Sequence, residues 1–468
     1  MKDRGLKKVM NSLDIIVVAF GAMIGWGWVV SSGRWIQNAG VLSTIIGFII
    51  GGTMIYFVGM IYAELTTAMP RVGGELVFSY KALGVNGSYI CVWALILSYI
   101  GVVCFEACSV PEILQYVFPS LMKIRLFTVA GSDVYLSGVL VAGIATVAIT
   151  VINIVGIKAA SVLQTVLTIA LAAIGVALIV SSAIRGTYGN LTGQFTVGNT
   201  TENTVKNMLS VAVVAPFFLF GFDVIPQVAE EINISLKKVG RLLLMSIVLA
   251  VLFYAFIVLS IGLALNPNEI REVMDGSGLA AAYAMEKVFN SKVMAKVLII
   301  GGLCGIVTSW NSFLIGGSRA IFAMAESNMI PSAFSKLHPK HKTPITALIL
   351  VGILSLVAPF FGRTMLVWIS DAASFTCCLA YCIVGVSFLL LRKKEPQLER
   401  PFRVKHYKVV GVSAIAMSGF MVIMYIIPGT GCTLVRQEWI IVGCWAILGL
   451  LFYLISRVKY GNRFGGYE

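Results

Sequence analysis

Charged and histidine residues are scarce in this chain. Only 12% of its 468 residues are Asp, Glu, Lys or Arg, against roughly a quarter in soluble domains. The three histidines, His338, His341 and His406, all lie in basic stretches, where no carboxylate or cysteine cluster completes a catalytic or metal-binding set. The scarcity argues against an enzyme, and we expect no catalytic residue and no metal site.

Motifs for pairing cysteines are lacking too. The nine cysteines fall almost all within apolar runs, and neither a CxxC motif nor a Cys–His cluster occurs, so a disulfide framework is not indicated. Basic residues outnumber acidic ones by 35 to 21. They collect in short loops between apolar runs, which is typical of a membrane protein, and we expect no nucleic-acid partner.

Apolar sequence is what the chain has in abundance, because 58% of its residues are hydrophobic. The chain is therefore predicted to be an all-α polytopic membrane protein surrounded by lipid. Windows of about 20 apolar residues predict twelve membrane-spanning helices, at residues 13–37, 41–68, 86–117, 134–155, 159–184, 207–232, 239–265, 292–324, 344–361, 364–391, 408–428 and 437–457.

The loops on one side of the predicted membrane hold most of the basic residues. An even number of spans places both termini on one side, and by the positive-inside rule that side is cytoplasmic. We expect a multi-pass protein of the cytoplasmic (plasma) membrane with both termini inside. The basic residues in question are Lys237, Lys238, Arg241, Lys336, Lys340, Lys342 and the run from Arg392 to Lys408.

Two loops have structural character of their own. Residues 70–75 read P-R-V-G-G-E, a helix stop with a glycine pair, and residues 76–83 are predicted to form a helix along the cytoplasmic face. Residues 266–290 predict a partly helical external loop, which is either a lid or a solvated connector.

Two predicted spans carry helix-breaking residues near their centres. Residues 19–33 read A-F-G-A-M-I-G-W-G-W-V-V-S-S-G, and each of the four glycines costs a helix roughly 1 kcal/mol relative to alanine. Residues 216–226 place a glycine and an aspartate between two prolines. A broken helix in a bilayer is tolerated where it lines a cavity. Two breaks five spans apart indicate an inverted repeat with a binding site between them.

Four motifs then resemble the amino acid–polyamine–organocation (APC) permeases. They are G-A-M-I-G-W-G-W…S-S-G at 21–33, P-R-V-G-G-E at 70–75, F-G-F-D…A-E-E at 220–231 and S-R-A-I-F-A-M-A…I-P-S-A-F at 318–334. The resemblance, over residues 1 to about 394, implies a leucine-transporter-type 5+5 inverted repeat plus two additional helices. The corresponding divisions are 1–184 for the first repeat, 185–206 for an external loop, 207–391 for the second repeat and 392–468 for a cytoplasmic loop, the last two spans and the C-terminal tail.

The first break offers two kinds of backbone group to a substrate. Amides around Gly25, Trp26 and Gly27 begin the outer half-helix, where free N–H groups favour a carboxylate. Freed carbonyls suit an ammonium, and these are expected at Ala22, Met23 and Ile24 in the first break and near Phe217 and Phe220 in the second.

Several side chains complete the predicted substrate site. Gly221 marks the second break, and Phe220 is the ring that we expect to close over a ligand. The resemblance implies that Phe313 floors the site. Trp26 departs from the small or hydroxylated residue of many relatives; it either points into the cavity and narrows the pocket or points toward lipid or a neighbouring helix.

Carboxylates within the predicted spans are candidates for ion coupling, because burying them is costly. Asp223 follows the second break and could accept hydrogen bonds from freed amides, or take a proton. Glu106 is either a second proton carrier or a protonated packing residue. Glu230 and Glu231 are expected to form ion pairs with the nearby Lys237 and Lys238.

The coupling ion is left as a three-way alternative. Proton-coupled relatives often carry a lysine in the fifth span, but the resemblance aligns Leu171 with that position. Sodium would need hydroxyl groups from the eighth span, and Thr308, Ser309 and Ser312 are available. No cofactor is expected beyond a coupling ion, H⁺ or Na⁺, and sodium symport, proton coupling and uncoupled exchange stay open.

The sequence thus predicts a secondary transporter that moves a small amino acid, or a related amine, by alternating access. A polyamine carrier or exchanger and a transporter-like nutrient sensor are the alternatives. No oligomeric state is predicted.

Overall fold

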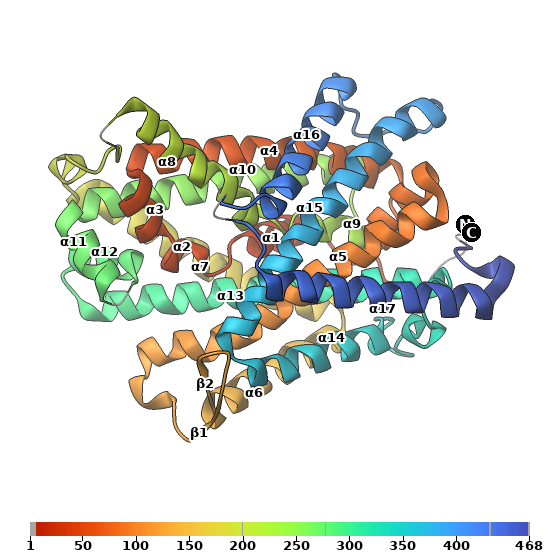
Figure 1. Cartoon of the computed structure of the whole chain (residues 1–468), viewed down its shortest axis with the longest axis horizontal. Helices are drawn as coiled ribbons and strands as arrows, with labels where there is room; N and C mark the ends of the chain where they lie inside the picture. Colours follow the sequence, from red (N-terminus) through yellow and green to blue (C-terminus); the bar gives the residue numbers. More distant parts are fainter. Residues whose placement is uncertain (1–5, 199, 277, 430–431, 467–468) are drawn as a thin grey trace.

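The computed structural model describes residues 6–198, 200–276, 278–429 and 432–466 and is almost entirely helical (Figure 1). Most long helices, including α4, α13 and α17, run along the long axis of the molecule. Ten helices of the described chain are long and apolar enough to cross a membrane: α4 (Val41–Ala68), α5 (Gly74–Val117), α6 (Leu136–Val155), α7 (Ile157–Arg185), α8 with its continuation (Thr201–Gln227), α10 (Leu236–Ala264), α13 (Lys292–Glu326), α15 (Gly362–Lys394), α16 (Tyr407–Ile426) and α17 (Arg436–Tyr460).

Two shorter apolar helices occupy the remaining predicted spans. They are α1 (Ser12–Met23) and α14 (Ile345–Val357), the latter extended by the 3₁₀ turn η6 (Ala358–Phe361). The polytopic helical class is confirmed, whereas the count of twelve crossings stays a prediction because α1 and α14 are short on their own.

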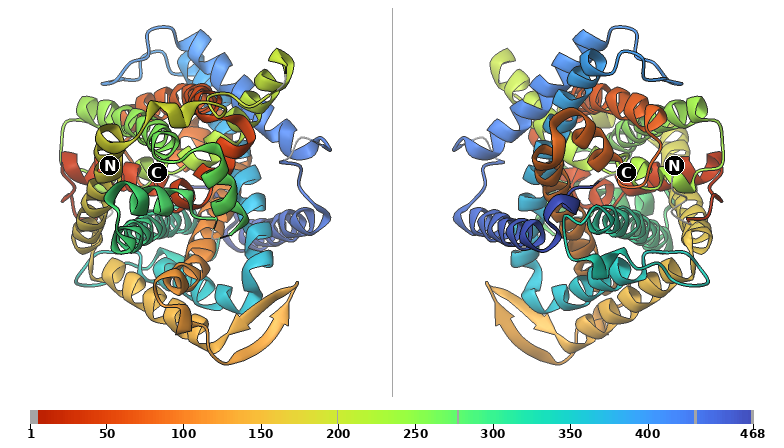
Figure 2. Two further views of the ribbon diagram at one scale, coloured as in Figure 1. Left: turned by 90° about the vertical axis from the view of Figure 1, so that its left-hand side faces the viewer. Right: turned by 90° about the vertical axis from the view of Figure 1, so that its right-hand side faces the viewer.

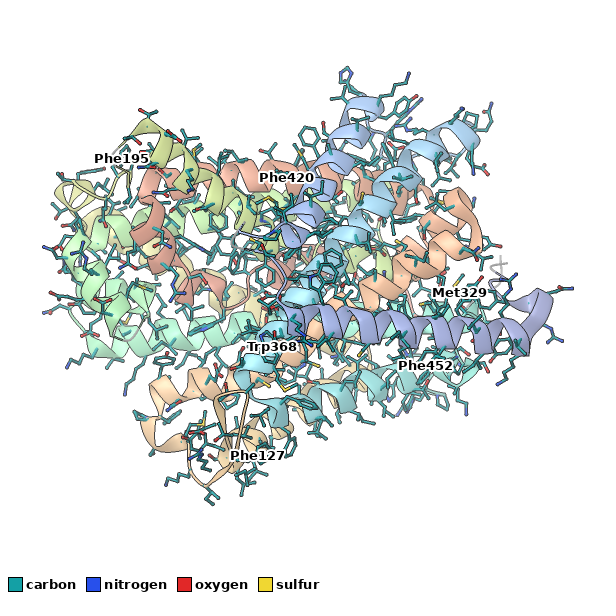
Figure 3. All side chains as sticks on the ribbon, in the orientation of Figure 1. Phe127, Phe195, Met329, Trp368, Phe420 and Phe452 are labelled. Carbon is teal, nitrogen blue, oxygen red and sulfur yellow. The ribbon has the colours of Figure 1, made fainter. Side chains whose placement is uncertain are left out.

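Helix α5 lies at the centre of the bundle, where it packs along α15 and α13, while α10 packs along α4. Figure 2, viewed along the long axis, shows the helices gathered around this centre. By contrast α17 is largely exposed, and apolar side chains such as Phe420 on α16 point outward (Figure 3). An apolar exposed surface is what a lipid environment requires.

The first predicted span is broken where its glycines predict. It consists of α1, α2 (Gly27–Val30) and α3 (Ser32–Ala39), and residues 24–26 between α1 and α2 are not helical. At Ile24 the backbone turns to φ −101° and ψ 78°. The break is confirmed.

The second break is confirmed as well. Helix α8 (Thr201–Val214) passes into the 3₁₀ turn η3 (Ala215–Leu219), residues 220–223 form turns, and α9 (Val224–Gln227) and η4 (Ala229–Glu231) follow. Gly221 has φ +126°, a conformation that other residues rarely adopt.

The predicted external loop at 185–206 contains the 3₁₀ turn η2 (Tyr188–Leu191) and the first turns of α8, at residues 201–206. The side chain of Thr200 caps this helix by accepting from the N–H of Asn203 at 3.2 Å. A polar first turn made the start of α8 resemble loop sequence, because helix caps and loops favour the same residues.

The two structured loops contain the helices that the sequence predicts. Residues 76–83 form the first turns of α5, which bends at Gly84, where φ is +76°. The segment 266–290 contains α11 (Pro267–Asp275) and α12 (Ala280–Phe289), at the left in Figure 1. This pair packs on the first span, since a Cβ at Gly33 would lie 2.6 Å from the Cβ of Ala280.

A β-hairpin between α5 and α6 was not predicted. After the 3₁₀ turn η1 (Pro119–Leu121), strands β1 (Arg125–Val129) and β2 (Ser132–Tyr135) pair antiparallel, at the edge of the bundle in Figure 2. The two residues that join them, Ala130 and Gly131, both have positive φ, as a two-residue hairpin turn requires.

Candidate functional site

A cavity of about 760 Å³ lies between the two breaks and extends to the hairpin. Its walls come from the first break, α5, the η3 segment, α10, α13 and α15. A cavity of this size at the meeting point of broken helices is a typical small-molecule site. The predicted site residues that line it are Ala22, Met23, Gly25, Trp26, Gly27, Phe217, Phe220, Phe313, Glu106 and Ser309.

The first break combines residues that line this cavity with backbone amides that have no backbone partner. Gly25, Trp26 and Gly27 line it, and within the described residues their N–H groups donate to no backbone carbonyl. Glycine is needed at position 27 because a Cβ there would collide with the ring of Phe218. Such amides at the start of a half-helix can hold a carboxylate.

The freed carbonyls are arranged differently from the prediction. A Cβ at Gly305 of α13 would lie 2.8 Å from the carbonyl oxygen of Ile24 and 2.6 Å from that of Gly25. These oxygens therefore face α13, and Ile24, which is fully buried, is not part of the cavity wall. The Met23 carbonyl accepts a hydrogen bond from the Tyr254 hydroxyl at 3.3 Å.

Gly221, the glycine of the second break, packs against the first break and does not line the cavity. A Cβ at Gly221 would lie 2.5 Å from the Cβ of Ala22 and 3.2 Å from the Met23 nitrogen. Phe217 and Phe220, which precede Gly221 in the chain, do line the cavity. The Phe220 ring meets the ring of Tyr381 edge-on, with centroids 5.5 Å apart.

The direction of Trp26, open from the sequence, is visible in the structure. Its ring atoms Cε3 and Cζ3 lie against Gly302 of α13, where a Cβ would collide with them. The ring thus fills a notch on α13, and the residue also lines the cavity. Phe313, also on α13, lines the cavity and packs against Tyr99 with ring centroids 5.6 Å apart.

Asp223 is fully buried and lies outside the cavity wall. Its Oδ1 accepts from the freed N–H of Gly221 at 2.9 Å, which is the contact predicted for it, and its Oδ2 accepts from the Tyr99 hydroxyl at 2.8 Å. Because Tyr99 packs on Phe313, it connects Asp223 to the wall of the cavity.

Glu106 is the one predicted coupling carboxylate that lines the cavity. Its side chain is 5% exposed, and its Oε2 has no hydrogen-bond partner within the described structure. A Cβ at Gly25 would lie 3.2 Å from its Oε1, so the carboxylate faces the first break.

The three predicted sodium ligands separate in the structure, since only Ser309 lines the cavity. Thr308 donates to the Gly305 carbonyl of its own helix at 2.9 Å, and Ser312 donates to the Val18 carbonyl of α1 at 3.1 Å. Leu171 of α7 is fully buried, and its Cδ1 would lie 2.8 Å from a Cβ at Gly305. It therefore lies beside the carbonyls of the first break.

The ion pair predicted for Glu231 has a different partner. The Glu231 carboxylate binds Arg319 of α13 at 2.9 Å, with both side chains almost fully buried, while Lys237 and Lys238 are exposed. The turn η4 directs Glu231 into the bundle, away from its sequence neighbours. A partner 88 residues away leaves no local signal in the sequence.

Other cavity residues were not predicted. Tyr254 and Phe218 line the inner part, and Cys108 lines the wall formed by α5. The hairpin contributes Asp133 and Tyr135. The β-branched and aromatic residues on either side of Gly131 are a strand-and-turn signal that could have located the last two, whereas Tyr254 is one aromatic residue in an apolar run.

Comparison with known proteins gives matches along the whole chain. A family model described as amino acid permease matches residues 10–453. The branched-chain amino acid permease BcaP of Bacillus subtilis (strain 168) is 25% identical, over 98% of this chain and 95% of its own. The methylthioribose transporter of that strain is 23% identical over 98% and 95%, and its serine/threonine exchanger SteT is 24% identical over 90% and 91%.

Proposed function

Because the chain belongs to the amino acid permease family of the APC superfamily, we propose that it is a secondary transporter. Its substrate is a small amino acid, bound between the unwound centres of the first and sixth spans and moved across the membrane by alternating access. One relative is a methylthioribose transporter, so the substrate proposal depends on the site as well as on the family.

The observation that carries the proposal is the row of free amides at the first break. Three consecutive residues, from Gly25 to Gly27, line a cavity that is large enough for an amino acid, and their N–H groups donate to no backbone carbonyl of the described residues. Backbone N–H groups in this arrangement recognise a carboxylate, which is the group that all amino acids share.

The contact between the two breaks supports an inverted repeat of five plus five helices. Gly221 of the second break packs on Ala22 and Met23 of the first, as two half-site helices that cross at a midplane would do. With the loops placed by the positive-inside rule, the termini are cytoplasmic. The hairpin end of the cavity then faces outward, which corresponds to an outward-facing state of the proposed transport cycle.

Uptake into proteoliposomes tests the proposal. The purified full-length protein, reconstituted and screened with each radiolabelled amino acid, is expected to accumulate or exchange a small group of them. Binding without flux would instead support a nutrient sensor. Neither binding nor flux with any amino acid would overturn the proposal.

An amine or polyamine carrier is the second candidate, and the charge of the cavity favours it. The described lining residues include Glu106, Glu112 and Asp133 but no Lys, Arg or His. Competition separates the two candidates. Neutral amino acids are expected to displace the label, and displacement by putrescine alone would favour the amine carrier.

Coupling is tested by imposing sodium and pH gradients separately on the same proteoliposomes. Sodium symport would use the hydroxyl groups of Thr308, Ser309 and Ser312, whereas proton coupling would use Asp223 or Glu106. If Asp223 carries the proton, Asp223→Asn should lose accumulation driven by a pH gradient and keep exchange. Accumulation that persists in this variant would assign the proton to another group.

A further inference from the structure

Glu75 is a buried carboxyl that lies outside the cavity. It is the last residue of the P-R-V-G-G-E turn, belongs to the first turn of α5 and has no exposed surface. It faces α9, the short helix after the second break. A Cβ at Gly74 would lie 2.3 Å from the Cβ of Pro226, and the Nε2 of Gln227 donates a hydrogen bond to the Glu75 Oε2. Glu75 therefore connects the start of α5 to the segment that follows the second break.

No cation balances this carboxyl. Among the described residues, no Lys, Arg or His forms an ion pair with Glu75. The neighbouring helix α4 shows the alternative arrangement, because its fully buried Glu64 is bound by Arg392 at 2.6 Å and by Arg400 at 3.1 Å. A carboxylate buried without such partners is strongly unfavourable, and a group in this position takes up a proton instead.

The hydrogen bonds around Glu75 are short of one donor. The Oε1 of Glu75 and the Oε1 of Gln227 are both buried, and neither has a hydrogen-bond partner in the described part of the chain. An ionised carboxylate and an amide oxygen are both acceptors, so neither can satisfy the other. A proton on the Glu75 Oε1 turns this atom into a donor, and one hydrogen bond then satisfies both oxygens.

The titratable groups around Glu75 do not supply the missing charge. The Asp223 carboxyl is close enough to act on Glu75 electrostatically, and two ionised carboxylates so placed would repel each other. The Tyr62 hydroxyl of α4 lies near the carboxyl but makes no hydrogen bond of good geometry. The other titratable groups of this region are Cys91 and Tyr99 of α5, Cys377 and Tyr381 of α15, and Arg319 of α13, which is already bound by Glu231.

We propose that Glu75 is a proton-binding site and that its proton is donated to the Oε1 of Gln227. The neutral acid and the amide then form two hydrogen bonds that hold α9 against α5. When the proton returns to water, two acceptors are left facing each other and the attachment of α9 weakens. Neither side chain lines the cavity, so the inference does not depend on the substrate or on the proposed function.

The first test detects the proton. Infrared difference spectra at neutral pH compare the purified full-length protein with Glu75→Gln. The wild type should show the C=O band of one neutral carboxyl that the variant lacks. Glu399→Gln, at an exposed side chain, is the matched control and should lose only carboxylate absorption. Loss of carboxylate absorption in Glu75→Gln as well would overturn the proposal.

The second test uses stability. Glu75→Gln keeps both hydrogen bonds, because its amide has an N–H where the neutral acid has its proton, and it cannot ionise. Stability that requires a bound proton is lost as the pH rises. The unfolding temperature of the wild type should therefore fall relative to Glu75→Gln by about 2 °C or more from about pH 5.5 to about pH 8.5. Glu399→Gln should follow the wild type. A difference between the wild type and Glu75→Gln that is constant with pH would overturn the proposal.

The third test measures the attachment of α9 by hydrogen exchange. At alkaline pH the amides of residues 224–232 should exchange several-fold faster in the wild type than in Glu75→Gln, and at acidic pH the two proteins should match. Equal exchange at both pH values would show that the pair does not hold α9. If Glu75→Gln is not recovered folded, Gln227→Leu decides. It should shift the band of the neutral carboxyl to higher frequency, because the hydrogen bond to its C=O is lost, and an unshifted band would overturn the pairing.

Discussion

The two helix breaks differ in what their unpaired groups face. At the first break, Gly25, Trp26 and Gly27 line the cavity, and their N–H groups donate to no backbone carbonyl of the described residues. At the second break, the N–H of Gly221 is bound by Asp223, and Gly221 itself packs against the first break. Similar helix-breaking residues therefore line a cavity in the first span and form a packing contact in the sixth.

The difference follows from what surrounds each break. The second break carries its own hydrogen-bond acceptor, Asp223, two residues after Gly221. Glu231, which follows this break in the chain, is bound by Arg319. The first break has no acidic residue within it. Its residues from Gly25 to Gly27 line the cavity, and their N–H groups donate to no backbone carbonyl of the described residues, which is why a binding role fits the first break better than the second.

Substitution at the first break should have the largest effect on binding. Gly27→Val is expected to reduce substrate affinity by roughly 100-fold or more, because the new side chain collides with Phe218 and displaces the amides from their place. Binding to the purified protein measures this. The matched control, Gly419→Val on α16, adds a side chain where no atom lies within 4 Å, and affinity should be retained. An equal loss of substrate affinity in both variants would contradict a special binding role for the first break.

Substitution in the Glu231–Arg319 ion pair, next to the second break, should mainly lower the stability of the fold. Arg319→Met removes the partner of the buried Glu231 carboxylate, and loss of one member of a buried pair costs roughly 3–5 kcal/mol. Thermal unfolding in detergent should show a clear loss of stability. Arg241→Met, at an exposed basic residue of α10, serves as the control. Unfolding temperatures that match in the two variants would show that the pair does not anchor this segment.

Replacing one glycine of each break with alanine tests the comparison between the two breaks directly. Gly221→Ala should destabilise the fold by about 1–3 kcal/mol, because φ is +126° and the Cβ would lie 2.5 Å from Ala22. Gly25→Ala should unfold near the wild-type temperature and bind substrate more weakly. The comparison is wrong if Gly221→Ala changes only binding and Gly25→Ala changes only stability.

The smallest effect is expected at Tyr254. Tyr254→Phe removes the hydrogen bond to the Met23 carbonyl and keeps the ring, so substrate affinity should fall by only a few-fold, consistent with about 1 kcal/mol for one hydrogen bond. Exchange kinetics measure this. Tyr188→Phe, at a side chain that is 82% exposed, should behave as the wild type does. A loss as large as that of Gly27→Val would make Tyr254 part of the binding site.

The helical class and both breaks could be predicted because their causes are local. Apolar runs of the length of a bilayer and clusters of glycine or proline act on the residues that carry them. The contact between Asp223 and the Gly221 amide is local too, and it was foreseen.

The directions of groups at the site could not be predicted, because distant segments decide them. Trp26 lies in a notch that Gly302 of α13 leaves open, and the carbonyls of Ile24 and Gly25 face Gly305 on the same helix. Glu231 finds Arg319 across the bundle. Each of these contacts joins residues far apart in the sequence, and no periodic pattern in a single chain indicates them.

The thiol of Cys108 in the cavity wall gives the unmodified protein an internal reporter. A membrane-impermeant thiol reagent can reach this sulfur only while the cavity is open to the side on which the reagent is added. The labelling rate at Cys108, read separately from that of the other free thiols such as the exposed Cys444, therefore reports how much time the cavity spends open to that side. A bound substrate should slow the reaction by occupying the same space.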